Sequence, residues 1–287
     1  KATKETHAEV GDKSNDALRV NACDIRAKVM GEGANLAITQ KGRVEYALNG
    51  GRLNADFIDN SGGVDSSDHE VNIKILMNAV MRNKAYAMDV KKRDKLLASL
   101  TDEVGNLVLR NNYQQSQAIS LMELQAAEML TEHAALISEL ERKTGLNRAL
   151  ENLPDDDEIQ NRLRVGRGLT RPELAILQAH AKIAFTWDLL DSDIPNSKAM
   201  EGRLLRYFPK KLGDTYAKEI MGHRLKREII CTTLASSVIN RMGPTFVRGA
   251  TAKNSAPPAN VAKAFIIVRE AFGLRELWAE IEGLDNK

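Results

Sequence analysis

Two glycine-containing segments carry the side chains of this sequence that are best placed to hold a ligand. They are residues 31–35 (GEGAN) and residues 60–67 (NSGGVDSS). Glycine lets a backbone approach a ligand closely because it has no Cβ. The second segment supplies Ser66, Ser67 and Asp68 as caps for a helix that we expect to begin near Glu70. Because a helix amino end attracts anions, the spacing predicts a site for a group such as a carboxylate.

Short apolar stretches precede both glycine segments and predict the elements that position them. Ala27–Met30 reads as a buried strand that leads into the first segment, and Phe57–Asp59 reads as a second strand. A strand that runs into glycine is how an open α/β sheet brings backbone to a ligand at its carboxyl edge. From Glu70 the apolar period changes to about 3.6, which predicts a long helix towards Lys91.

The residues alone also allow a purely structural interpretation. Glycine pairs near strand ends are commonly turns, and short motifs arise by chance. Asn35 and Asn60 would then only stabilise turns, and Ser67 would only cap a helix.

The amino-acid sequences of these segments resemble those of a known family. Residues 32–35 (EGAN) and 60–67 (NSGGVDSS) resemble the paired signature that closes the coenzyme domain of glutamate dehydrogenases. Residues 11–20 (GDKSNDALRV) and 46–78 are similar to the very large NAD-dependent glutamate dehydrogenases of bacteria. The similarity continues through TRPELAILQAHAKI, RYFP, HRLKREIICTTLASSVINRMGPTF and REAFGLRELWAEIEGLD, and so covers most of the chain.

The resemblance implies a cofactor, NAD, and the residues that hold it. Asn35 would hydrogen-bond the nicotinamide-side ribose, while Gly33 and Ala34 would let the backbone approach. Asn60 would contact the same end of the coenzyme.

The resemblance also implies a substrate, L-glutamate, which is oxidatively deaminated to 2-oxoglutarate and ammonia. Ser67 would bind the side-chain carboxylate and Val64 would line its pocket. The proline and threonine that usually follow EGAN are replaced by Leu36 and Ala37, and Ser61 stands where alanine is frequent. These departures suit the large bacterial class and leave the coenzyme geometry open.

No catalytic residue is assigned, because several family features have no match in the chain. No GxGxxG opens a helix, so the pyrophosphate site is missing. The family's lysine-bearing glycine-rich segment and its catalytic aspartate also have no counterpart. We expect these parts to precede Lys1, which makes the chain a fragment that is inactive by itself and binds NAD weakly or not at all.

Composition excludes several other classes of protein. The 41 basic and 39 acidic residues nearly cancel, which argues against nucleic-acid or membrane-surface binding. No apolar run reaches the roughly 18 residues of a membrane span. Cys23 and Cys231 lie far apart and read as reduced thiols of a cytoplasmic protein. No histidines are paired at helical spacing, so no metal site is predicted.

The predicted fold class is mainly α. Residues 1–70 would be the carboxyl-terminal part of an NAD-binding domain, an incomplete Rossmann-like α/β segment, and residues 71–287 an all-helical domain. A Thr170-to-Glu173 capping box, a Gly145 stop and a Gly243-Pro244 stop mark helix ends in the second part. The helical region that starts at Thr101 should break near residues 111–112, and Gly249–Asn260 should be a loop. That domain would position the coenzyme domain or contact other subunits of a homo-oligomer, through exposed apolar patches.

The sequence also allows two other functions. The chain could be a self-sufficient helical scaffold or regulatory binding module, in which residues 31–70 are structural loops. It could also belong to a related amino-acid dehydrogenase with a different side-chain pocket. The dehydrogenase interpretation requires both glycine segments to face one cleft, with Asn35, Asn60 and Ser67 within reach of one ligand.

Overall fold

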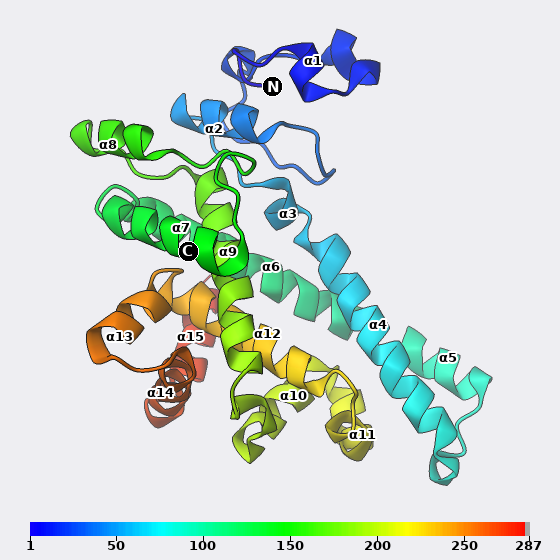
Figure 1. Cartoon of the computed structure of the whole chain (residues 1–287). Coiled ribbons are helices and arrows are strands. Elements are labelled where there is room, and N and C mark those ends of the chain that lie inside the picture. The colour runs from blue at the N-terminus through cyan, green and yellow to red at the C-terminus, as the bar shows by residue number, and fades with distance from the viewer. Residues whose placement is uncertain (285–287) are drawn as a thin grey trace.

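The computed structural model describes residues 1–284, and these residues form helices joined by turns (Figure 1). The α-helices are α1 (His7–Val10), α2 (Gln40–Leu48), α3 (Asp56–Asp59), α4 (Ser61–Arg82), α5 (Val90–Ala98), α6 (Thr101–Leu124), α7 (Leu130–Thr144), α8 (Asp156–Arg164), α9 (Arg171–Leu190), α10 (Glu201–Tyr207), α11 (Lys210–Met221), α12 (Lys226–Met242), α13 (Phe246–Asn254), α14 (Pro258–Ala271) and α15 (Leu274–Gly283). Short 3₁₀ helices lie at Lys13–Leu18, Ala22–Asp24, Lys84–Tyr86, Ile194–Asn196 and Lys198–Met200.

The mainly α prediction is confirmed, but the two predicted strands are not found in the described residues. The first is reduced to one isolated parallel bridge between Val29 and Arg52. The second lies inside α3, where the Ile58 N–H donates to the Ala55 carbonyl at 3.1 Å. Segments of three or four residues are too short for their apolar period to distinguish a strand from a helix. Neither segment has a neighbouring strand with which to form a ladder. The predicted α/β segment is therefore not confirmed in the described residues.

Helix α4 begins nine residues earlier than expected, at Ser61 instead of near Glu70. Gly62 and Gly63 therefore lie in its first turn, and Ser66 and Ser67 lie inside the helix, where they cap nothing. The Asn112 side chain covers the helix start by donating to the Ile58 carbonyl and the Ser61 hydroxyl, each at 2.8 Å. The helix is continuous through residue 70 and ends at Arg82, not near Lys91.

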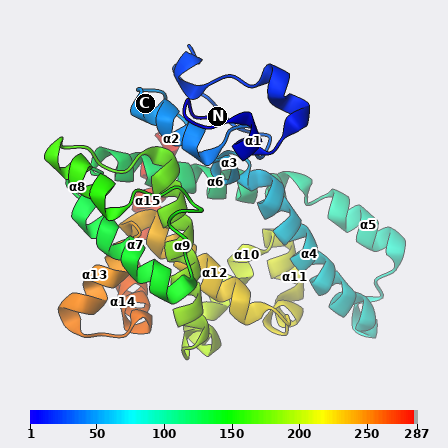
Figure 2. The ribbon, with the colours of Figure 1, turned by 45° about the horizontal axis from the view of Figure 1, so that its top comes forward.

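The main core is organised around α9, which packs along α12 and also meets α2, α6, α7 and α14. Figures 1 and 2 show α9 running through the middle of the molecule. Its fully buried side chains include Leu174, Ala175, Leu177, Phe185 and Leu189. An amphipathic helix normally buries one stripe, and burial of this extent is typical of a helix surrounded by others.

The predicted capping box at the start of α9 is confirmed, and its Glu173 also forms an ion pair. The Thr170 N–H and hydroxyl both donate to the Glu173 carboxylate at 2.7 Å. Arg162 of α8 binds the same carboxylate through two nitrogens, at 2.8 and 2.9 Å. Glu173 is therefore buried with its charge paired, as a buried carboxylate must be.

Other helix boundaries in the carboxyl-terminal part were predicted with mixed success. The helical region after Thr101 breaks between Leu124 and Leu130, not near residues 111–112. Gly145 ends α7 with a φ of +69°, as predicted. The expected loop at Gly249–Asn260 is helical up to Asn254.

Residues 1–54 have a small core of their own, built from Ala22, Tyr46 and Leu53. Gly51 is needed there, because a Cβ at this position would meet the Tyr46 ring at 2.3 Å. In Figure 1 this part (α1 and α2) lies at one end of the molecule. No helix among residues 1–284 is both long and apolar enough to cross a bilayer.

The buried His133 of α7 predicts a loss of stability in acid. Burial lowers the pKa of His133 to about 4, from 6.5 in the unfolded chain. Between these pH values the unfolded chain binds a proton that the folded chain does not, so the free energy of unfolding falls as the pH falls from about 6.5 to about 4. Urea unfolding at pH 7 and pH 4.5 should show a smaller fall for His133→Leu than for the parent. His7→Leu, at an exposed position, is the control. An unchanged fall in His133→Leu would refute this assignment.

Candidate functional site

The structure places the two glycine segments side by side. The Asn60 side-chain amide donates to the Asn35 side-chain oxygen at 3.1 Å, across the gap between the turn before α2 and the start of α4. Gly63 permits this position of Asn60, because a Cβ on Gly63 would meet the Asn60 Oδ1 at 2.7 Å. The two amides predicted to contact one end of a coenzyme therefore touch each other.

A buried ion network holds the first glycine segment in place. Arg43 of α2 contacts the two Glu32 oxygens at 2.7 and 2.8 Å, and lies 3.2 Å from Asp56. All three side chains are buried. Burial by itself lowers the pKa of Arg43, but the hydrogen bonds and charges of Glu32 and Asp56 outweigh it and raise that pKa. Arg43 therefore stays charged.

The same acidic side chains accept hydrogen bonds from the backbone of the glycine segment. The Leu36 N–H donates to Asp56 and the Ile38 N–H donates to Glu32, each at 2.9 Å. The Glu32 N–H donates to Asp59 at 2.8 Å. Leu36 has a φ of +64°, a conformation that side-chain-bearing residues rarely adopt. The carboxylates thus fix a loop that its own backbone preferences would not hold.

Polar contacts connect this loop to the helical body. The Asn54 amide donates to Asp59 at 2.8 Å, and the Asn54 oxygen accepts from Arg171 at 2.8 and 3.1 Å. Arg171, the first residue of α9, also pairs with Glu123 of α6 at 2.7 Å. The position of the glycine segment is therefore set by the start of α9.

The predicted substrate residues lie on α4 and point to its surface. Asn60, Val64 and Ser67 are spaced by four and three residues, which places them on one side of the helix start. Val64 and Ser67 are exposed, and the Ser67 hydroxyl donates to the Gly63 carbonyl at 3.1 Å. Ser67 is the seventh residue of α4, so the free N–H groups of a helix terminus do not surround it, contrary to the prediction.

The remaining predicted cofactor residues are also at the surface. Gly33 and Ala34 are exposed, and a Cβ at Gly33 would meet nothing within 4 Å. The backbone of residues 33–35 is therefore open to a ligand. No cluster of side chains able to hold a metal ion occurs in residues 1–284.

Reasoning from the sequence missed the network that positions the site. Arg43 and Asp56 carry no recognisable spacing relative to Glu32, because their partnership arises only when α2 folds beside α3. The one available signal was the pair Asp56 and Asp59 directly before Asn60, since acidic residues beside a glycine-rich loop can accept backbone N–H groups.

Two family models match separate parts of the chain. Residues 1–122 match the family model described as bacterial NAD-glutamate dehydrogenase, catalytic domain, and residues 166–287 match the model described as glutamate dehydrogenase, C-terminal. The chain is 48% identical over 285 residues to the NAD-specific glutamate dehydrogenase of Pseudomonas aeruginosa. It is 45% identical over 287 residues to that of Halomonas elongata and 42% identical over 281 residues to that of Mycobacterium tuberculosis.

The chain belongs to the bacterial NAD-specific glutamate dehydrogenase family. These matches cover 98% to 100% of the chain. The chain spans only 17% to 18% of the length of the same relatives.

Removing the arginine from the buried network should loosen the glycine segment. Arg43→Met leaves two buried carboxylates unpaired, a change that typically costs about 3–5 kcal/mol. We expect amide hydrogen exchange at Leu36 and Ile38 to become at least about 100-fold faster. Arg52→Met is the matched control, because Arg52 is exposed and lies 3.5 Å from Glu123, a contact worth about 1 kcal/mol at most. Equal exchange in both variants would contradict the role given to Arg43.

Proposed function

We propose that this chain supplies part of the coenzyme and substrate site of an NAD-dependent glutamate dehydrogenase, which converts L-glutamate to 2-oxoglutarate and ammonia. The single observation that carries the proposal is the contact between Asn35 and Asn60. Residues 25 positions apart in the sequence meet side by side, as two contacts to one coenzyme end require. In this proposal residues 1–70 are the carboxyl-terminal part of a Rossmann-like domain, and residues 71–287 are the helical domain.

The residues present fit one end of NAD. The donors and acceptors that ribose hydroxyls and a carboxamide need are offered by the exposed Asn35 amide, the half-buried Asn60 amide and an open glycine backbone. Gly33, Ala34, Asn35 and Asn60 would hold that end. When bound, the nicotinamide accepts the hydride from the α-carbon of the amino acid, and the protein supplies binding and orientation. Ser67 would donate its hydroxyl to the side-chain carboxylate of glutamate while Val64 excludes water beside it.

Exposure of the apolar residues at this site supports the presence of further protein around it. Leu36 is 87% exposed and Val64 is 66% exposed, although both border the proposed ligand. Burial of such side chains is favourable by about 1.5–3 kcal/mol each. We propose that the remainder of a longer chain, or another subunit of a homo-oligomer, covers this surface. The cytoplasmic location stays a prediction.

A chimera tests the proposal. Residues 1–287 would replace the matching segment of the Pseudomonas aeruginosa relative, and NAD reduction would be followed with glutamate as substrate. We expect the chimera to be active and the isolated chain to be inactive. Turnover by the isolated chain would show that the missing family features are not needed, and an inactive but folded chimera would argue against the proposal.

Within the chimera, Ser67→Ala should raise the KM for glutamate about tenfold or more, because a hydrogen bond to a charged group is lost. Ser66→Ala is the matched control, since its hydroxyl is equally exposed and bonds the Gly62 carbonyl of the same helix at 2.7 Å. If both variants keep the parent KM, Ser67 does not bind substrate.

A further inference from the structure

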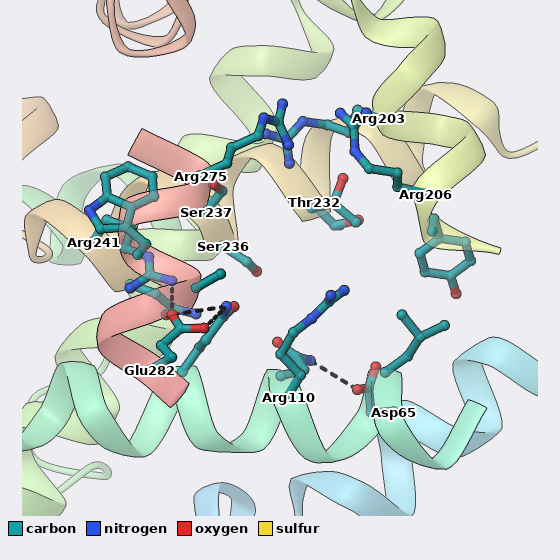
Figure 3. A pocket seen from close by; sticks show the side chains of 18 of the residues that line it. Asp65, Arg110, Arg203, Arg206, Thr232, Ser236, Ser237, Arg241, Arg275 and Glu282 are labelled. Carbon is teal, nitrogen blue, oxygen red and sulfur yellow. Dashed lines mark hydrogen bonds and ion pairs between the residues drawn. The ribbon is translucent and has the colours of Figure 1, made fainter. Parts of the chain in front are cut away.

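A cavity of about 440 Å³ lies on another side of α4 and is lined by arginines from five helices. They are Arg110 (α6), Arg203 and Arg206 (α10), Arg241 (α12), and Arg269 and Arg275 (α14 and α15). Figure 3 shows Arg110 rising from α6 into the cavity, with Arg203, Arg206 and Arg275 across from it. None of these arginines was singled out by sequence reasoning.

Acidic side chains compensate only part of this positive charge. Arg241 pairs with Glu282, and both Arg269 and Arg275 pair with Glu270 at 2.7 Å. Within residues 1–284, no ion pair joins Arg110, Arg203 or Arg206 to a carboxylate, and the buried Nε of Arg203 has no hydrogen-bond partner. Asp65 and Asp68 also line the cavity, and Asp65 accepts a hydrogen bond from Asn111 at 3.0 Å.

The arginines of the cavity repel one another. Burial lowers the pKa of Arg203 to about 9, and the charges of Arg269 and Arg275 act in the same direction. Burial likewise lowers the pKa of Arg206, again with help from Arg275 and Arg269. Both remain cationic at pH 7, and each is held close to charges of its own sign. A bound anion would relieve this repulsion.

Hydroxyl groups complete the lining. Ser236 and Ser237 of α12 face the cavity, and Thr232 lies beside them (Figure 3). Thr232 donates to the Glu228 carbonyl at 2.8 Å, one turn back in its own helix. Guanidinium groups together with hydroxyls are the donors that recognise phosphate and carboxylate oxygens, because guanidinium binds such groups through two parallel hydrogen bonds.

We propose that this arginine cavity binds a compact anion with at least two negative charges, of the phosphate or carboxylate class. It is separate from the proposed coenzyme and substrate residues. Asp65, Asp68 and His69 face the cavity, whereas Asn60, Val64 and Ser67 lie on another side of α4, because each residue turns the helix by about 100°. The occupant is thus an additional ligand of the protein.

Titration of the full 287-residue chain with inorganic pyrophosphate and, separately, with succinate tests this site. Ionic strength is held constant with sodium chloride, so that general screening does not contribute. Calorimetry should show saturable binding of at least one of the two, and which one binds distinguishes phosphate from carboxylate chemistry. The measurement needs neither NAD nor glutamate, so its failure would leave the proposed function untouched.

The double variant Arg203→Gln/Arg206→Gln should weaken that binding about tenfold or more, because charge-assisted hydrogen bonds are lost. Arg164→Gln/Arg167→Gln is the matched control, since it removes the same charge from exposed positions on and just after α8. Ser67→Ala should also leave the affinity unchanged. Absence of saturable binding, or equal losses in the cavity and control variants, would overturn the proposal.

Folding of the variants can be checked independently. Removing Arg203 relieves like-charge repulsion, so Arg203→Gln should have a Tm in anion-free buffer no lower than that of the parent. Pyrophosphate or succinate should raise the parent Tm more than the variant Tm, since a ligand stabilises the state that it binds. Arg110→Gln, at the opposite wall, should weaken binding in the same direction. A ligand-induced rise that is equal in parent and variants would contradict the site.

Discussion

The packing of α9 against α12 is the contact on which the rest of this structure depends. α9 contributes the largest continuous set of buried side chains, and it touches helices from both halves of the chain. Its first residue, Arg171, binds Asn54 and Glu123, so it determines where the glycine segments sit on the helical body. On the far side of the same contact, α12 presents Ser236, Ser237 and Arg241 to the arginine cavity. The pair of helices α9 and α12 therefore positions both candidate sites.

Charge pairing takes the place of a sheet beneath the glycine segments. In an open α/β fold, neighbouring strands hold such a loop through ladder hydrogen bonds. Here Glu32, Asp56 and Asp59 accept the loop N–H groups instead, with Arg43 neutralising two of them. Buried ion pairs of this kind contribute little net stability, because desolvation offsets their attraction. Their effect is geometric, because the same carboxylates bind both Arg43 and the N–H groups of the loop.

Helix α4 separates the two sites by its own periodicity. One side carries the exposed Val64 and Ser67 beside the Asn35–Asn60 contact. Another side carries Asp65, Asp68 and His69, and His69 stacks on Tyr207 of α10 with ring centroids 4.6 Å apart. Because it is 22 residues long, α4 extends from α3, beside the glycine segments, to α11, against which it also packs (Figure 1).

Much about this protein was determined by sequence alone. The helical periodicity after Glu70, the capping box at Thr170–Glu173 and the Gly145 stop are local features, and each depends on residues within one or two turns. The family could also be predicted, because family membership depends on sequence similarity. Tertiary structure decided the rest. Whether Phe57–Asp59 becomes strand or helix depends on partner strands, and none pairs with it among residues 1–284. The pairing of Arg43 with Glu32 and the gathering of six arginines require helices distant in sequence to meet, and no local pattern encodes those meetings.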